Sequence, residues 1–70
     1  MKTLLILSMI VSNGPEQGYT TIDTPAAKFE TQQDCIDQMR EVNRDTNGIV
    51  TAFCAIPNKD DWSWNVYLQL

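Results

Sequence analysis

The spacing of apolar residues predicts one helix near the middle of the chain. Four of them recur at the three- to four-residue spacing that places side chains on one helix face: Cys35, Ile36, Met39 and Val42. Thr31 can cap the first turn with its hydroxyl, so we expect the helix to begin at Gln32. Residues 46–48, Thr-Asn-Gly, can close it in the left-handed conformation. A helix of about three and a half turns is unstable alone in water, so its apolar face must pack on other elements.

The rest of the chain has the patterns of strands. Residues 1–11 and 49–56 are apolar on both faces, which is typical of central strands. Residues 18–24 are more polar, as expected of an edge strand that Pro25 stops or distorts. Residues 62–70 alternate and predict a half-buried strand with five residues facing inward: Trp62, Trp64, Val66, Leu68 and Leu70.

These elements predict a single α+β domain over residues 1–70 with the order ββαββ. Short connections favour an antiparallel four-stranded sheet of order 2-1-3-4, with the apolar strands in the centre and the helix packed on one face. One helix covers only one face of such a sheet. The apolar residues of the other face would then lie against water, and they are Leu4, Ile6, Ile10, Ile49 and Phe53, or their alternates. Such a patch implies a protein partner or a second copy of the chain.

Residues 1–14 also allow a different interpretation. A positively charged start followed by an apolar run is typical of a signal peptide, although the only small-residue cleavage region, residues 12–14, is followed directly by Pro15. We favour a first strand, with export as the alternative. The apolar run is too short to span a membrane as a helix.

Composition narrows the range of functions. The net charge is −4, with five basic residues and no histidine, so the chain lacks the cationic patch of a nucleic-acid-binding protein. Cys35 and Cys54 are its two cysteines, and without histidine they cannot form a four-ligand zinc site. They form either a disulfide or two buried thiols. A disulfide closing a loop of about twenty residues would contribute about 3 kcal/mol of stability.

Candidate contact residues lie on the helix and on two of the strands. The acidic stripe of the helix is either a docking surface for a basic partner or a solvated face paired with Arg40 and Arg44; its residues are Asp34, Asp37, Glu41 and Asp45. Phe53 belongs to the uncovered sheet face, and Tyr67 is expected on the outer face of the last strand. Trp62 and Trp64 are expected to fill the core beneath the helix, with an aromatic ligand platform as the alternative.

Catalytic chemistry has no support in the residue pattern. The chain has no histidine base, no serine or cysteine with an evident activating group and no glycine-rich phosphate loop. Asp60 and Asp61 are adjacent carboxylates, but a turn is the simpler explanation for them. We therefore expect a non-enzymatic protein that uses no cofactor, metal or small-molecule substrate.

The layout of the chain resembles that of the short orphan accessory proteins of tailed bacteriophages. The resemblance rests on residues 1–8 (Met-Lys-Thr-Leu-Leu-Ile-Leu-Ser), 29–35 (Phe-Glu-Thr-Gln-Gln-Asp-Cys) and 53–57 (Phe-Cys-Ala-Ile-Pro). It implies an accessory protein that inhibits a host or defence component, and it carries over no site residues. We expect such a protein to act in the host cytoplasm. Residues 62–70 are a strand that such proteins often lack. The alternatives are an exported disulfide-linked domain and a homo-oligomeric structural or virion component.

Overall fold

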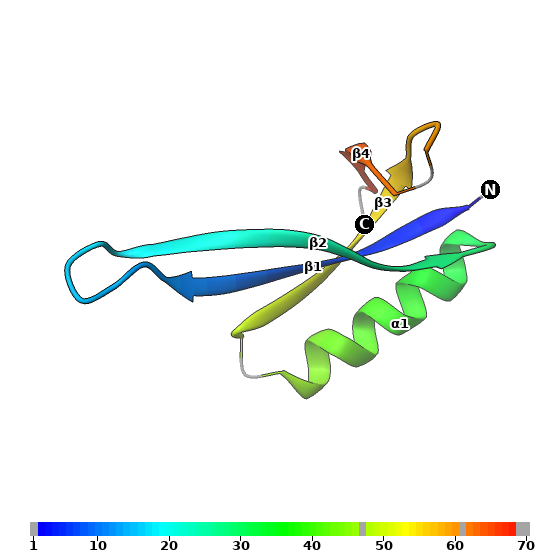
Figure 1. The fold of residues 1–70 in the computed structure, drawn as a ribbon. Helices are drawn as coiled ribbons and strands as arrows, with labels where there is room; N and C mark the ends of the chain where they lie inside the picture. The colour runs from blue at the N-terminus through cyan, green and yellow to red at the C-terminus, as the bar shows by residue number, and fades with distance from the viewer. Residues whose placement is uncertain (1, 47, 61, 69–70) are drawn as a thin grey trace.

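The structure is a computed structural model that describes residues 2–46, 48–60 and 62–68. Its elements are, in chain order, β1 (Thr3–Ser12), β2 (Tyr19–Phe29), α1 (Gln32–Asp45), β3 (Val50–Pro57) and β4 (Trp64–Tyr67). The strands form one antiparallel sheet of order β2-β1-β3-β4, and α1 packs on one of its faces (Figure 1). The predicted ββαββ fold and sheet order are confirmed.

Helix α1 begins where the capping pattern places it. Thr31 is extended, and its Oγ1 accepts a hydrogen bond of 3.2 Å from the amide of Asp34. At the other end, Gly48 takes the left-handed conformation with φ at 83°, whereas Thr46 remains extended. Asn47, which was expected to help close the helix, lies outside the described residues. The N-terminal prediction is confirmed because a cap depends on neighbouring residues only.

The sheet is packed on both faces. On the helix face, apolar side chains of α1 pack around one cluster of buried residues. The cluster consists of Leu5, Cys35, Ala52 and Cys54. On the opposite face, Leu4, Ile6 and Ala55 are fully buried, and the half-buried Trp64 packs against them. The expectation that Leu4 and Ile6 lie against water is therefore wrong. Ile10, Ile49 and Phe53 are exposed as expected, at 41% or more.

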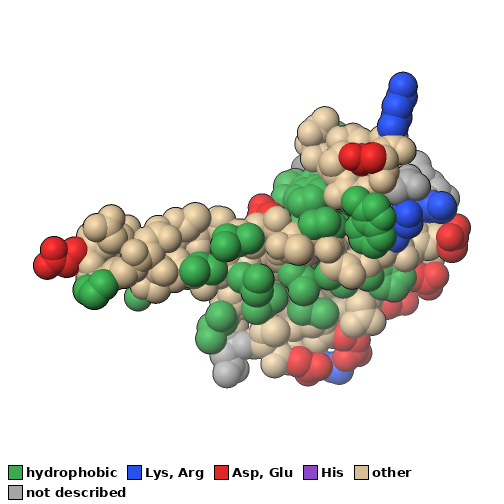
Figure 2. Space-filling model, in the orientation of Figure 1, with side chains coloured by type: hydrophobic (Ala, Val, Ile, Leu, Met, Phe, Trp, Pro, Cys, Tyr) green, Lys and Arg blue, Asp and Glu red, His purple; other side chains and the backbone are tan. Residues whose placement is uncertain are grey.

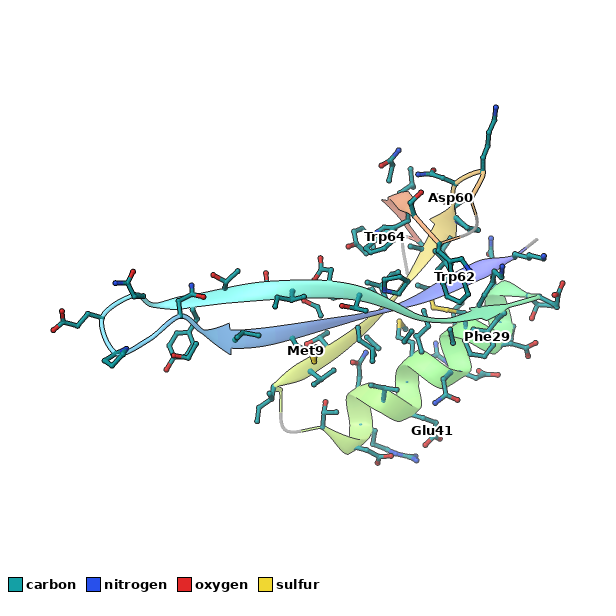
Figure 3. The ribbon with its side chains drawn as sticks, viewed as in Figure 1. Met9, Phe29, Glu41, Asp60, Trp62 and Trp64 are labelled. Carbon is teal, nitrogen blue, oxygen red and sulfur yellow. A yellow bond between two sulfur atoms is a disulfide. The ribbon has the colours of Figure 1, made fainter. Side chains whose placement is uncertain are left out.

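Neither tryptophan lies where alternation placed it, and a bulge in β4 explains the position of Trp64. Ala55 pairs with Tyr67 and Pro57 pairs with Trp64, so the pairing shifts by one residue at Asn65. Trp64 and Tyr67 consequently share the face opposite α1, and the predicted core position of Trp64 beneath the helix is wrong (Figure 3). Trp62 precedes the strand and is about half exposed. Gln69 and Leu70, which were assigned to this strand, lie outside the described residues.

Strand β2 continues through Pro25 to Phe29, so the predicted strand end at residue 24 is wrong. Leu5 pairs with Ala27 and Ile6 pairs with Pro25, which leaves one extra residue in β2 as a bulge. Proline is tolerated there because β2 is an edge strand, where a missing N–H need not remove a ladder hydrogen bond. The distortion that proline predicted is present, but the strand does not end.

The far ends of β1 and β2 form a projecting hairpin, which we call the arm and define as residues 9–22. β3 pairs with β1 only as far as Met9, whereas β2 follows β1 to Ser12. The arm therefore extends past β3 and α1 and lengthens the molecule to 43 Å (Figure 1). Hydrophobic side chains are exposed along it (Figure 2); they are Met9, Ile10, Val11, Tyr19 and Ile22.

Candidate functional site

The face of the sheet opposite α1 contains a cleft of about 420 Å³. All four strands contribute to its lining, which consists of Ser8, Thr21, Asp23, Phe53 and Tyr67. The register explains this convergence, because Ser8 pairs with Asp23, and Ile6, two residues before Ser8, pairs with Phe53. Side chains of paired residues project to the same face of a sheet. The cleft lies where the arm joins the body of the domain.

Two aromatic rings and one carboxylate give the cleft its character. The rings of Phe53 and Tyr67 meet edge to face, with centroids 5.7 Å apart and an interplanar angle of 66°. Tyr67 Oη donates a hydrogen bond of 3.3 Å to Asp23 Oδ2, which links β4 to β2 across the two central strands. Tyr67 pairs with Ala55, which faces away from α1, so the Tyr67 side chain lies on this face.

The charge of the cleft is that of Asp23. In the part of the chain that the structure describes, the carboxylate of Asp23 has the Tyr67 hydroxyl as its single hydrogen-bond partner and no ion pair. Lys28 lies on this face but away from Asp23, because Lys28 pairs with Leu4 whereas Asp23 pairs with Ser8, four residues further along β1. The ammonium of Lys28 lies 5.0 Å from the centroid of the Trp62 ring. The cleft is thus apolar with an uncompensated negative group at its edge.

The acidic stripe of α1 lies on the other side of the molecule. Its carboxylates are exposed on the outer surface of the helix, and the labelled Glu41 points away from the sheet (Figures 2 and 3). Glu41 pairs with Arg44, and Arg44 Nε also lies 3.7 Å from Asp45 Oδ1. Asp37 accepts a hydrogen bond of 2.8 Å from Gln33 Nε2. The structure therefore brings Phe53 and Tyr67 together and separates both from the acidic residues.

Cys35 and Cys54 form a disulfide between α1 and β3, with Cα atoms 6.2 Å apart. The pairing is confirmed over the alternative of two free thiols. Both cysteines are buried in the helix-face core, and Cys35 Sγ lies 3.4 Å from the carbonyl oxygen of Leu4. A bond buried in this way is a structural cross-link rather than an accessible redox group.

Two polar residues have roles that sequence reasoning missed. Asp23 was one polar position among several in an edge strand, with no signal that Tyr67 would reach it. Asn43 lies on the helix, and its side-chain amide makes two hydrogen bonds to Ala52 of β3: Oδ1 accepts from Ala52 N at 2.7 Å, and Nδ2 donates to Ala52 O at 3.1 Å. It thereby occupies an edge of β3 that β4, paired only with residues 55–57, does not cover.

Asp60 organises the turn between β3 and β4. Its Oδ1 accepts hydrogen bonds from the Ser63 hydroxyl at 2.7 Å and from the Ser63 amide at 3.0 Å. These bonds, led by the hydroxyl, lower the pKa of Asp60 below its ordinary value of 3.8. Asp61 lies outside the described residues, so the pair of adjacent carboxylates has no structural description. Among the described residues, no three side chains of the metal-binding types gather to hold an ion.

The fold and cleft define a small disulfide-linked α+β domain with a partly open sheet face. Comparisons with protein-family models, with curated proteins and with solved structures give no match to this chain. In the described residues, no helix is both long and apolar enough to cross a membrane.

Proposed function

We propose that the protein is a small non-catalytic binding protein that contacts a protein partner through the sheet face opposite α1. The observation that supports this is the exposed aromatic cleft at Phe53 and Tyr67, which adjoins the apolar arm. Ile10 on the arm is 51% exposed and Phe53 is 41% exposed. Exposed apolar patches rimmed by polar residues mark interaction sites on small soluble domains, and aromatic residues are enriched at the centres of such interfaces.

The partner we propose is a host protein, and the mode of action is inhibition by occupying its surface. This follows from the resemblance to bacteriophage accessory proteins and from the lack of catalytic groups in the sequence. On this proposal the protein acts in the host cytoplasm, and the buried Cys35–Cys54 disulfide would have to withstand the reducing conditions there. The acidic stripe of α1 is an alternative contact surface, and because it lies on the opposite side of the sheet, substitutions can test the two surfaces separately.

A homo-oligomer is the second candidate, and the arm favours it. A two-stranded ribbon is marginally stable in water by itself, and the apolar side chains on both faces of the arm would be covered if two copies paired. Light scattering at several protein concentrations tests this candidate. A mass that stays at 8.0 kDa across the concentration range would exclude it.

Export remains an alternative that intact mass can test. In the structure β1 lies between β2 and β3 and supplies the buried Leu4, Leu5 and Ile6. Cleavage after residue 14 would remove this strand, so an exported form would need a different sheet. Intact mass of protein from its native source, measured with and without reductant, distinguishes a full-length chain from a shortened one.

Pull-down from the native host compares the two surfaces. Phe53→Asp places a charge in the cleft, whereas the double variant Asp37→Lys/Glu41→Lys reverses charge on the outer face of α1. We expect Phe53→Asp to lose the partner and the helix variant to retain it, with unchanged circular dichroism and thermal midpoint as the folding control. The reverse pattern would identify the acidic stripe as the contact surface, and retention by both variants would refute partner binding through either one.

A further inference from the structure

We infer that the cleft lined by Phe53, Tyr67 and Asp23 binds an arginine side chain of the partner. This inference rests on the proposed function and names the chemistry that the site recognises. It starts from the composition of the lining: two aromatic rings, two hydroxyls from Ser8 and Thr21, one carboxylate and no basic group. A cationic side chain with a long apolar stem matches each of these parts.

The carboxylate provides the first part of the site. Asp23 Oδ2 accepts a hydrogen bond from Tyr67 Oη, which holds the carboxylate beside the aromatic ring. Its other oxygen, Oδ1, has no hydrogen-bond partner within residues 2–46, 48–60 and 62–68. A guanidinium group can donate to that free oxygen, and charge-assisted hydrogen bonds of this type are stronger than bonds between neutral groups.

The rings provide the second part. The face of an aromatic ring carries negative electrostatic potential, which attracts a cation placed over it. The planar guanidinium can stack on such a ring while donating to a carboxylate, and it is less strongly hydrated than an ammonium group, so arginine fits better than lysine. Near Leu4 on this same face, the chain already places Lys28 over the Trp62 ring, with the ammonium 5.0 Å from the ring centroid.

The size of the cleft is consistent with a side-chain ligand. Its volume of about 420 Å³ lies within the range of about 300–1,000 Å³ that is usual for ligand pockets. The apolar lining can cover the methylene stem of arginine, while the hydroxyls of Ser8 and Thr21 can accept from its remaining N–H groups. Lysine and a purely apolar side chain are the competing occupants that the experiment must separate from arginine.

The experiment is an NMR titration of the ¹⁵N-labelled protein with N-acetyl-arginine amide. N-acetyl-citrulline amide is the control probe, because it has nearly the same shape without the charge. We expect saturable amide shifts confined to the cleft, around Thr21, Asp23, Phe53 and Tyr67, with arginine and not with citrulline. Equal shifts with the two probes, or no saturable shift with arginine up to tens of millimolar, would overturn the inference. Stronger binding of N-acetyl-lysine amide would overturn the preference for arginine.

Matched variants test whether Asp23 is responsible. Asp23→Asn keeps the shape of the side chain and removes its charge, and we expect it to weaken arginine binding about five- to tenfold. Asp37→Asn removes one negative charge from the opposite side of the molecule and should leave the titration unchanged. An equal loss in both variants would show attraction to the net charge of the protein rather than a site.

The inference and the proposed function can fail independently. If Phe53→Asp loses the partner but Asp23→Asn retains it at wild-type affinity, the sheet face is the interface and the arginine site is wrong. If the arginine probe binds at Asp23 while Phe53→Asp still retains the partner, the arginine site is correct and the proposed interface is wrong.

Discussion

Reducing the Cys35–Cys54 disulfide should remove much of the stability of this domain. The cysteines are 19 residues apart in sequence, and cross-linking a loop of that length lowers the entropy of the unfolded chain by an amount worth about 3 kcal/mol at 25 °C. A domain of 70 residues typically has a free energy of unfolding of about 3.5 to 10 kcal/mol. The disulfide therefore accounts for about a third or more of the total.

Urea unfolding followed by circular dichroism measures this contribution directly. The oxidised and reduced forms have the same sequence and differ only in the cross-link, so their difference in unfolding free energy isolates it. We expect a loss of about 3 kcal/mol on reduction, together with a fall of the thermal midpoint by about 12–24 °C.

The double variant Cys35→Ala/Cys54→Ala is the control for side effects of the reductant. Its unfolding free energy should equal that of the reduced protein or be somewhat lower, because both sulfur atoms are removed from the core. Adding the reductant should leave the unfolding free energy of this variant unchanged. The chain-entropy argument is refuted if reduction of the wild-type protein changes its unfolding free energy by less than about 1 kcal/mol.

Three further predictions follow from single contacts. Asn43→Ala should lower the unfolding free energy by about 1–3 kcal/mol, because the N–H and C=O of Ala52 lose their partners. If urea unfolding gives this variant the same unfolding free energy as the wild-type protein, the role of Asn43 is contradicted. Trp64→Ala should cost about 2–3 kcal/mol, less than the 3–5 kcal/mol of a fully buried ring, and a cost below about 1 kcal/mol in the same assay would show that Trp64 does not pack the face opposite α1. Asp60 should titrate below 3.8 in a carboxyl ¹³C NMR experiment, so its stabilising contribution is present above that pH and is lost as the pH falls through the lowered pKa. Ser63→Ala should raise the pKa of Asp60 in this titration, and an unchanged pKa would show that the Ser63 hydroxyl is not the cause of the lowering.

Sequence alone predicted the features that depend on local patterns. The capping residue Thr31 and the three- to four-residue apolar spacing placed the start and buried face of α1, including Cys35. The two strands that are apolar on both faces were predicted to be central, and short connections then determined the sheet order. The disulfide was one of two open alternatives until the structure placed Cys35 and Cys54 against each other.

The candidate site was not predictable in the same way. Phe53 and Tyr67 were each proposed as contact residues, but on the basis of exposure, without the knowledge that they touch. Strict alternation put Tyr67 on the outer face, where the structure has it, but it put Trp64 beneath the helix, because the extra residue at Asn65 places Trp64 and Tyr67 on the same face. Asp23 had no distinguishing local signal.

The physical reason lies in the range of the interactions. Helix caps, turns and hydrophobic periodicity arise between residues a few positions apart, so the sequence alone determined the elements and their approximate order. The pairing register, the bulges in β2 and β4 and the contact of Tyr67 with Asp23, 44 residues away, depend on packing between distant segments. Only the tertiary structure decided these, and they create the cleft.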